Sequence, residues 1–135
     1  MANEEVSASL VPGKHASTFG GNAIACAAAA AVIEAIDEEG LLENAVAIGD
    51  YIKGKLEQLQ EKHGVIDHIR GVGLMQGIQL TQSGKEIVNQ CLEKGLRINC
   101  TKETVLRFMP PMIATRQQID EAIWILDSVL SESEK

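Results

Sequence analysis

The chain has 135 residues, a formal net charge of −7, and 45% hydrophobic but only 3% aromatic residues. This length suits one domain with an aliphatic core, and the hydrophobic fraction argues against a disordered chain. The acidic charge without a basic cluster argues against nucleic-acid partners, and the absence of a long apolar run or a signal peptide argues against membranes, so a cytoplasmic protein is expected.

The leading residues 1–22 contain a turn signal at Pro12-Gly13 and precede an alanine-rich helix predicted over residues 23–36. This helix is apolar nearly all round, which is not typical of a surface helix. Because little of the chain remains to cover it, we expect another part of a longer protein, or a partner subunit, to pack on it.

The loop before that helix holds two hydroxyl residues, Ser17 and Thr18, followed by Gly20, Gly21 and Asn22. Asn22 can cap the helix, and the glycines let the backbone approach a ligand closely. Since a helix N-terminus attracts negative charge, this combination is typical of an anion site. A plain capped turn is the alternative interpretation.

The next elements in chain order are a helix and two strands. Apolar residues at helical spacing predict a helix from Leu41 that closes at His63-Gly64, where His63 would interact with the helix dipole. Strands are predicted over residues 65–70 and 74–80, around a glycine-containing bend at 71–73. On the first of them, His68 is interpreted as a solvated strand residue rather than a general base.

The last third of the chain shows two capping boxes. Ser83 with Glu86 predicts the start of a short helix, and Thr115 with Gln118 predicts the start of the final one. Between them, strands are predicted over residues 96–98 and 104–109, and a frayed polar tail follows from Ser131. The resulting fold class is α+β, a small, mostly antiparallel sheet with helices on one face, preceded by the long alanine-rich helix.

Arg107 is the second candidate site residue. In a strand, Leu106 and Phe108 face one side and Arg107 the other, so Arg107 points away from helices that cover the first side. Its planar guanidinium suits two hydrogen bonds to one carboxylate. A surface arginine paired to a nearby glutamate is the alternative.

No catalytic nucleophile–base set and no metal site is visible. The three cysteines, Cys26, Cys91 and Cys100, match no zinc spacing and have an odd count that argues against a disulfide framework. Each is predicted to be a small buried residue in a reducing compartment.

Four stretches in this order resemble class III pyridoxal-phosphate-dependent aminotransferases: residues 15–22 with 25–29, then 39–45, 70–75 and 106–111. The resemblance implies the C-terminal part of such a fold-type I enzyme. Residues 1–36 would end the large cofactor-binding domain, residues 37–131 would form the small domain, and residues 132–135 a polar tail.

The resemblance also implies roles for individual residues. Ser17 and Thr18 would contact the phosphate of pyridoxal 5'-phosphate held by the neighbouring subunit of a homodimer. Arg107 would lie in the active site, near a substrate carboxylate or an acidic partner. The resemblance implies that the substrates are the small molecules N-acetylornithine and 2-oxoglutarate, as in arginine biosynthesis. An enzyme that acts on ornithine or on 4-aminobutyrate is the alternative.

The lysine that carries the cofactor in this family lies upstream of the first motif, and none of the lysines here occupies that context. They are Lys14, Lys53, Lys55, Lys62, Lys85, Lys94, Lys102 and Lys135. The chain alone is therefore expected to be inactive, because the machinery that makes the cofactor useful is incomplete. A non-enzymatic oligomerisation module is the competing hypothesis.

Overall fold

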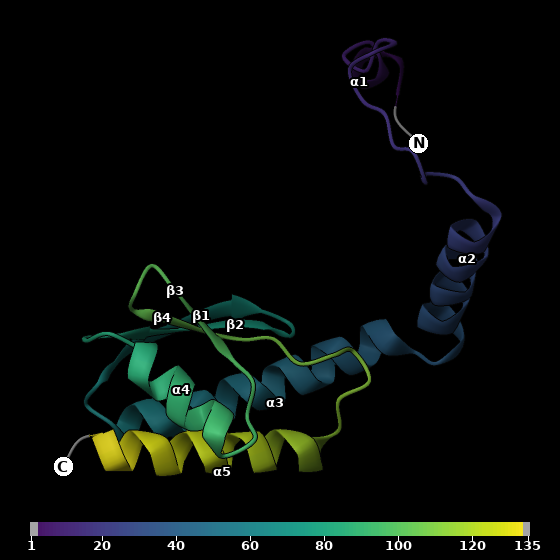
Figure 1. The fold of residues 1–135 in the computed structure, drawn as a ribbon. Helices are drawn as coiled ribbons and strands as arrows, with labels where there is room; N and C mark the ends of the chain where they lie inside the picture. Colours follow the sequence, from purple (N-terminus) through teal and green to yellow (C-terminus); the bar gives the residue numbers. More distant parts are fainter. Residues whose placement is uncertain (1–2, 134–135) are drawn as a thin grey trace. The chain divides into compact units, whose positions relative to one another are not determined.

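The computed structural model describes residues 3–133 and divides into two compact units, Met1–Glu38 and Glu39–Lys135. The first unit contains α1 (Glu4–Ser7) and α2 (Ala23–Glu38) (Figure 1). Helix α1 is absent from the sequence prediction; the Asn3 side chain caps it by accepting a hydrogen bond from Val6 N at 2.9 Å. Helix α2 begins where predicted and extends two residues past residue 36.

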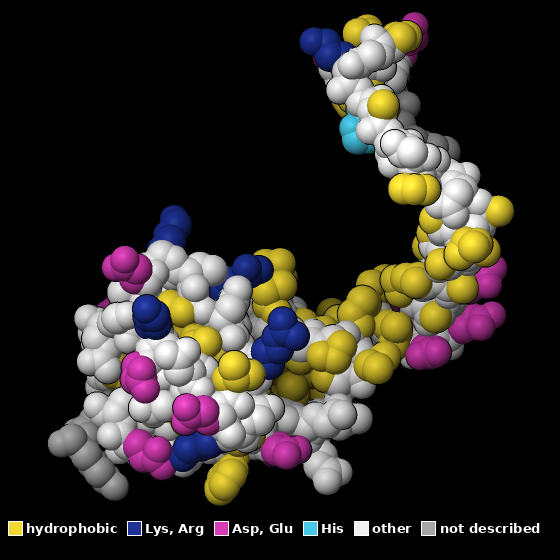
Figure 2. All heavy atoms as spheres, in the orientation of Figure 1, with side chains coloured by type: hydrophobic (Ala, Val, Ile, Leu, Met, Phe, Trp, Pro, Cys, Tyr) yellow, Lys and Arg dark blue, Asp and Glu magenta, His cyan; other side chains and the backbone are white. Residues whose placement is uncertain are grey.

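The predicted turn at Pro12-Gly13 is present. Lys14 N donates to Val11 O at 3.1 Å, and Gly13 has a φ of 89°, a conformation that glycine adopts without strain. Helix α2 buries none of its residues within this unit. Ile24 is 83% exposed and Ile33 69% exposed, and hydrophobic atoms line the helix in Figure 2.

The second unit is a four-stranded antiparallel sheet covered on one face by three helices (Figure 1). The spatial order of the strands is β1-β2-β4-β3. The elements are α3 (Leu41–Lys62), β1 (Ile66–Val72), β2 (Met75–Leu80), α4 (Lys85–Glu93), β3 (Asn99–Thr101), β4 (Val105–Phe108) and α5 (Arg116–Ser133). The predicted α+β class is confirmed.

The core lies between the sheet and the helices and is aliphatic, as the composition predicts. Ile52 and Leu56 of α3, Ile78 of β2, Leu106 of β4 and Leu126 of α5 are all fully buried. Burial alternates along β2, where every second residue faces the helices, so the strand has one core face and one outer face.

The strand predicted over residues 96–98 is wrong, because β3 begins at Asn99. The chain leaving α4 is still tied to that helix, since Leu96 N donates to Cys91 O at 2.8 Å and Gly95 N to Leu92 O at 3.0 Å. These hydrogen bonds cap the end of α4, so strand pairing begins only at Asn99, which pairs with Arg107.

The bend between the first two strands also differs from the prediction. Gly71 and Val72 belong to β1, where they pair with Gln76 and Met75, so the turn is formed by Gly73 and Leu74 alone. The glycine at position 71 has a φ of 155° and is pressed against β2: a Cβ there would lie 2.1 Å from Met75 O. Gly71 thus marks a close approach of the β1 and β2 backbones and is not part of the turn.

One of the two capping boxes forms. Thr115 and Gln118 exchange hydrogen bonds, with Thr115 N donating to Gln118 Oε1 at 3.0 Å and Gln118 N to Thr115 Oγ1 at 3.3 Å. The box predicted at Ser83 is wrong, because Gly84 is the N-cap of α4 and its N–H donates to Glu103 O at 2.8 Å. Contact with the loop before β4 thus displaces the helix start by one residue.

Two further predictions are wrong, namely the frayed tail from Ser131 and the burial of Cys26. Residues 131–133, predicted as a frayed tail, continue α5, and residues 134–135 lie outside the described part. Cys91 is buried, and burial raises the pKa of its thiol to about 11. Cys100 is half-buried, but Cys26 is exposed on α2, contrary to the prediction of a buried side chain.

His63 occupies the C-cap of α3, as predicted, and its ring also has a partner on another helix. The ring is 2% exposed, and its Nε2 lies 2.6 Å from Asp127 Oδ1 of α5. Lys62 Nζ donates to the same carboxylate at 2.6 Å. Asp127 therefore links the end of α3 to α5.

Asp127→Asn is expected to lower the free energy of unfolding by about 1–3 kcal/mol at neutral pH, because two donors lose a charged acceptor. Burial alone would raise the pKa of Asp127, but hydrogen bonds from Lys62 and His63 outweigh it and hold the pKa below the usual 3.8. A carboxylate with a lowered pKa stabilises the fold above its unfolded pKa, and this contribution disappears as the pH falls through the folded pKa.

The difference between Asp127→Asn and wild type should therefore shrink as the pH is lowered from about 6 toward 3, measured by urea unfolding at each pH. Glu57→Gln is the matched control, since within the described part of the chain Glu57 makes only an exposed 4.0 Å pair with Lys53. A difference independent of pH would contradict an ionic role for Asp127.

Gly49→Ala is expected to destabilise the second unit by about 1–3 kcal/mol, because there is no room for a methyl group. A Cβ at Gly49 of α3 would lie 2.5 Å from the backbone carbon of Gly73 in the β1–β2 turn. Gly54→Ala in the same helix is the control: nothing lies within 4 Å, so it should stabilise by up to about 1 kcal/mol through helix propensity. Equal stability of the two variants in thermal unfolding would contradict this packing.

Residues 3–133 contain no helix that is both long enough and apolar enough to cross a membrane. In the same residues, no three His, Cys, Asp or Glu side chains are grouped so that they could hold a metal ion.

Candidate functional site

The first candidate site is the loop from Ser17 to Asn22 in the first unit. Every residue of this loop is exposed, and neither the Ser17 nor the Thr18 hydroxyl makes a hydrogen bond with another described residue. Gly20 folds back under Ser17: a Cβ on Gly20 would lie 2.9 Å from Ser17 Cβ and 3.0 Å from its Oγ. Gly20 therefore keeps the space beside the Ser17 hydroxyl open.

The loop is joined to α2 by Asn22. Ala25 N donates to Asn22 Oδ1 at 3.0 Å, and the Asn22 amide donates to Phe19 O at 2.5 Å. These bonds confirm the predicted cap and fix the loop against the helix start. Gly21 has a φ of 75°, which a side chain would strain. Two unpartnered hydroxyls in a loop that leads into a helix N-terminus can donate hydrogen bonds to an anion.

The second candidate site is Arg107 on β4, in the second unit. Leu106 and Phe108 are buried against the helices, and Arg107 lies between them, half-buried, on the opposite face of the sheet. Its Nη2 lies 2.9 Å from the Met109 sulfur, and no carboxylate of residues 3–133 lies within 4.0 Å of it. The predicted orientation is confirmed, and the alternative of a pair with a nearby glutamate does not hold among these residues.

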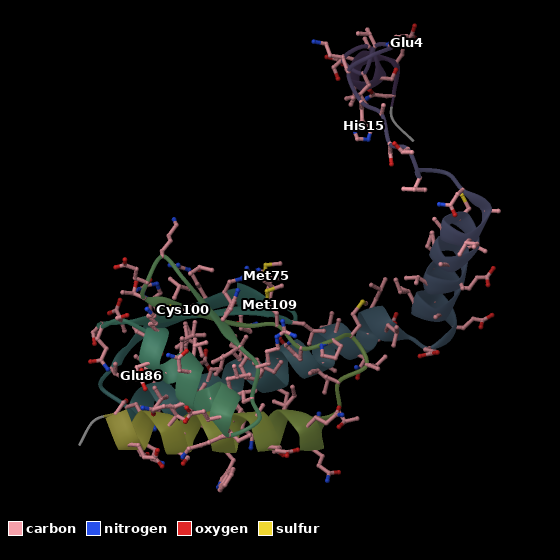
Figure 3. The ribbon with its side chains drawn as sticks, in the orientation of Figure 1. Glu4, His15, Met75, Glu86, Cys100 and Met109 are labelled. Atoms are coloured by element: carbon pink, nitrogen blue, oxygen red, sulfur yellow. The ribbon has the colours of Figure 1, made fainter. Side chains whose placement is uncertain are left out.

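The face that carries Arg107 is called the outer face of the sheet. Met75 and Met109 lie on the side of the sheet away from α5 (Figure 3). Two open depressions hollow this side, of about 350 and 320 Å³, and Arg107 lines both of them. The first also includes Arg97 and the second Arg70.

Arg107 is a predicted site residue, but Arg70 and Arg97 are not. Strand register places Arg70 in line with Arg107, because Arg70 pairs with Gly77 and Gly77 pairs with Arg107, whereas Arg97 lies before β3 and shares a depression with Arg107. His68, on the same strand as Arg70, is solvent-exposed as predicted, with its Nδ1 2.8 Å from Asp67 Oδ2. The Ser17 loop and Arg107 lie in different compact units.

Comparison with known proteins places the chain among related sequences. Residues 1–130 match the family model for class III aminotransferases. The acetylornithine aminotransferase of Caldanaerobacter subterraneus is 51% identical over 130 residues, which are 96% of this chain and 33% of that protein. The chain thus spans about a third of the length of the curated relatives that it matches.

Solved structures show the same relationship. The acetylornithine aminotransferase of Elizabethkingia anophelis superposes with a TM-score of 0.85 at 31% identity, over 98% of this chain and 36% of that one. The ornithine aminotransferase of Toxoplasma gondii, crystallised with partial occupancy of PLP at its active site, gives a TM-score of 0.83 at 29% identity, over 96% of this chain and 32% of that one.

Proposed function

The chain belongs to the class III aminotransferases, and we propose that the protein carrying it transfers an amino group between N-acetylornithine and 2-oxoglutarate, with pyridoxal 5'-phosphate as cofactor. The observation that carries this proposal is the 51% identity, over nearly the whole chain, to a protein named acetylornithine aminotransferase. Three further relatives at 42–46% identity carry the same name. Arginine biosynthesis in the cytoplasm is the corresponding cellular role.

The Ser17 loop fits the phosphate group of this cofactor. Its two hydroxyls have no hydrogen-bond partner among the described residues, and the Cβ-free Gly20 leaves room beside one of them. In the proposal, Ser17 and Thr18 donate hydrogen bonds to phosphate oxygens, and the start of α2 adds its partial positive charge. When bound, pyridoxal phosphate supplies the electron sink for the carbanion chemistry of amino transfer.

Arg107 fits a carboxylate of the substrate. Its guanidinium is held on the outer face by a rigid strand, and its only polar partner among residues 3–133 is the Met109 thioether. A guanidinium group without an ion-pair partner can donate two parallel hydrogen bonds to a carboxylate and so orient the substrate. Arg107 thereby acts in binding and orientation, and the chain itself supplies no group that moves a proton in this proposal.

The chain is proposed to act as one part of a larger enzyme. Residues 1–36 would complete the large cofactor-binding domain, with Ser17 and Thr18 reaching the cofactor of the neighbouring subunit in a homodimer. The exposed apolar surface of α2 supports this arrangement, since a large exposed apolar patch marks an interaction site. Residues 37–131 would form the small domain, and the chain alone would not transaminate.

The test compares amino donors on the complete protein encoded by the gene in which this sequence lies, supplied with pyridoxal phosphate and 2-oxoglutarate. We expect glutamate to form fastest with N-acetylornithine, more slowly with ornithine, and least with 4-aminobutyrate. The isolated 135-residue chain, assayed in parallel, is expected to form none. Preference for another donor would reassign the substrate, and turnover with no donor would refute the proposal.

A further inference from the structure

Asn44 joins two parts of the second unit that are far apart in the sequence. Its side chain is half-buried in the first turn of α3. The Nδ2 atom donates to Met112 O at 2.6 Å and to Ala114 O at 3.2 Å, both within residues 109–115, which we call the β4–α5 connection. Figure 1 shows this connection beside the start of α3. Because a primary amide carries two N–H groups, one Asn side chain can supply both hydrogen bonds.

The β4–α5 connection leaves the sheet as a stiff segment. Sheet pairing of β4 ends at Phe108, which pairs with Gln76. Pro110 and Pro111 have no N–H group and a φ that the ring fixes, and a proline also restricts the residue before it. Few backbone angles between Phe108 and Met112 are therefore free to change. An anchor at Met112 thus also sets the direction in which the chain leaves β4.

Met109 links this segment to Arg107. It lies between the last paired residue of β4 and Pro110, and its sulfur lies 2.9 Å from Arg107 Nη2. The backbone of Arg107 is held by pairing with Gly77 and Asn99, so the contact with Met109 acts on the guanidinium end of the side chain. A shift of the β4–α5 connection would move the Met109 sulfur and, with it, the guanidinium group.

We propose that Asn44 is a positioning residue for Arg107. By holding the β4–α5 connection, Asn44 keeps the guanidinium group where it meets a substrate carboxylate. Asn44 itself does not touch the substrate and acts only through the connection and Met109. The inference rests on the proposed function for the role of Arg107, and it gives a role to the stretch 39–45, to which the proposed function assigns none.

The test measures the KM for 2-oxoglutarate of the complete protein at a temperature at which every variant is folded. Asn44→Leu keeps a side chain of similar size but removes both donors, and we expect it to raise KM about threefold to tenfold with little change in kcat. Asn44→Gln keeps two N–H donors and should recover part of this loss. Asp127→Asn is the control for stability. It alters contacts with Lys62 and His63 at the far end of α3, so it should lower Tm but leave KM at the wild-type value.

A double-variant cycle tests whether Asn44 acts through Arg107. In the Arg107→Gln background, Asn44→Leu should leave KM unchanged, because the group that Asn44 positions is absent. In the Arg116→Gln background it should raise KM as in the wild type, since Arg116 follows the same connection but stacks on the Tyr51 ring at 5.1 Å. An equal increase in both backgrounds, an increase in Asp127→Asn, or an unchanged KM in Asn44→Leu would overturn the inference and, in an active protein, leave the proposed function standing.

Calorimetry of 2-oxoglutarate binding to the same proteins separates this inference from the proposed function. The Kd is measured without an amino donor, so it does not depend on amino transfer, and it should follow the same variant pattern as KM. A complete protein that forms no glutamate would refute the proposed function, whereas this pattern of Kd values would still support the role of Asn44. Kd values indifferent to Asn44→Leu would overturn that role.

Discussion

Arg107→Gln is expected to lower kcat/KM of the complete protein by about 10²–10³-fold, with the larger part of the loss in KM for 2-oxoglutarate. Truncating one partner of a hydrogen-bonded charge pair in a binding site costs about 2–5 kcal/mol, and each 1.4 kcal/mol is a factor of ten. Arg107 has a half-buried side chain and no ion pair among residues 3–133, so its donors are available for a substrate.

The fold should not suffer from this change. Among residues 3–133, the Arg107 side chain makes a polar contact only with the Met109 sulfur, and the core side of β4 is formed by Leu106 and Phe108. Arg107→Lys separates charge from geometry, because lysine keeps the charge but loses the planar fork. We expect it to recover only a small part of the activity, whereas Arg116→Gln should remain close to wild type. Activity of Arg107→Gln equal to that of Arg116→Gln in steady-state kinetics would contradict the role of Arg107.

The double variant Ser17→Ala, Thr18→Val is expected to raise the Kd of the complete protein for pyridoxal phosphate by at least about 10²-fold. A hydrogen bond to a charged group contributes about 1.5–3 kcal/mol, and two such bonds to the phosphate would be lost. Both hydroxyls are exposed and have no hydrogen-bond partner among the described residues, so their removal should not disturb the loop.

Equilibrium dialysis of the cofactor checks this expectation. Ser9→Ala is the matched control in the same unit, since the Ser9 hydroxyl already donates to Val6 O at 2.8 Å and is not free for a ligand. An unchanged Kd in the double variant would contradict the phosphate-binding role and leave the loop as a plain helix cap. A change of equal size in Ser9→Ala would show a general loss of structure in this unit instead.

The long elements of the fold could be predicted from the sequence because their patterns repeat over many residues. The apolar spacing of α3 and α5 and the alternation along β2 each specify one buried face, and tertiary packing agrees with them. The cap of α2 by Asn22 and the box at Thr115 were likewise predictable, since each depends on residues three positions apart.

The short elements were set by contacts that a local pattern does not contain. Hydrogen bonds at the end of α4 hold residues 95 and 96 and shift β3 to Asn99, and the Gly84 N–H finds Glu103 O instead of a Ser83 cap. The helix-terminal position of His63 was predictable, but its contact with Asp127 was not, because that partner lies 64 positions away. For Gly84 and His63 a partner distant in sequence decided the outcome, whereas the start of β3 follows from local backbone hydrogen bonds at the end of α4.

The same reasoning separates what was predictable in the candidate site. The Ser17 loop and the orientation of Arg107 follow from residue types and strand alternation, which are local. The position of Arg70 in line with Arg107 depends on strand order and register, in which β2 and β4 are neighbours although residues 81–104 separate them in the sequence. No spacing rule within one segment reveals such an alignment.

The most direct measurement of the central claim is glutamate formation by the complete protein from N-acetylornithine and 2-oxoglutarate, with and without added pyridoxal phosphate. The wild type and Arg116→Gln should form glutamate at similar rates, and Arg107→Gln and the Ser17, Thr18 double variant should lose most of it. High cofactor concentration should restore the double variant but not Arg107→Gln. A folded complete protein that forms no glutamate, or one whose rate is indifferent to all of these substitutions, would contradict the account.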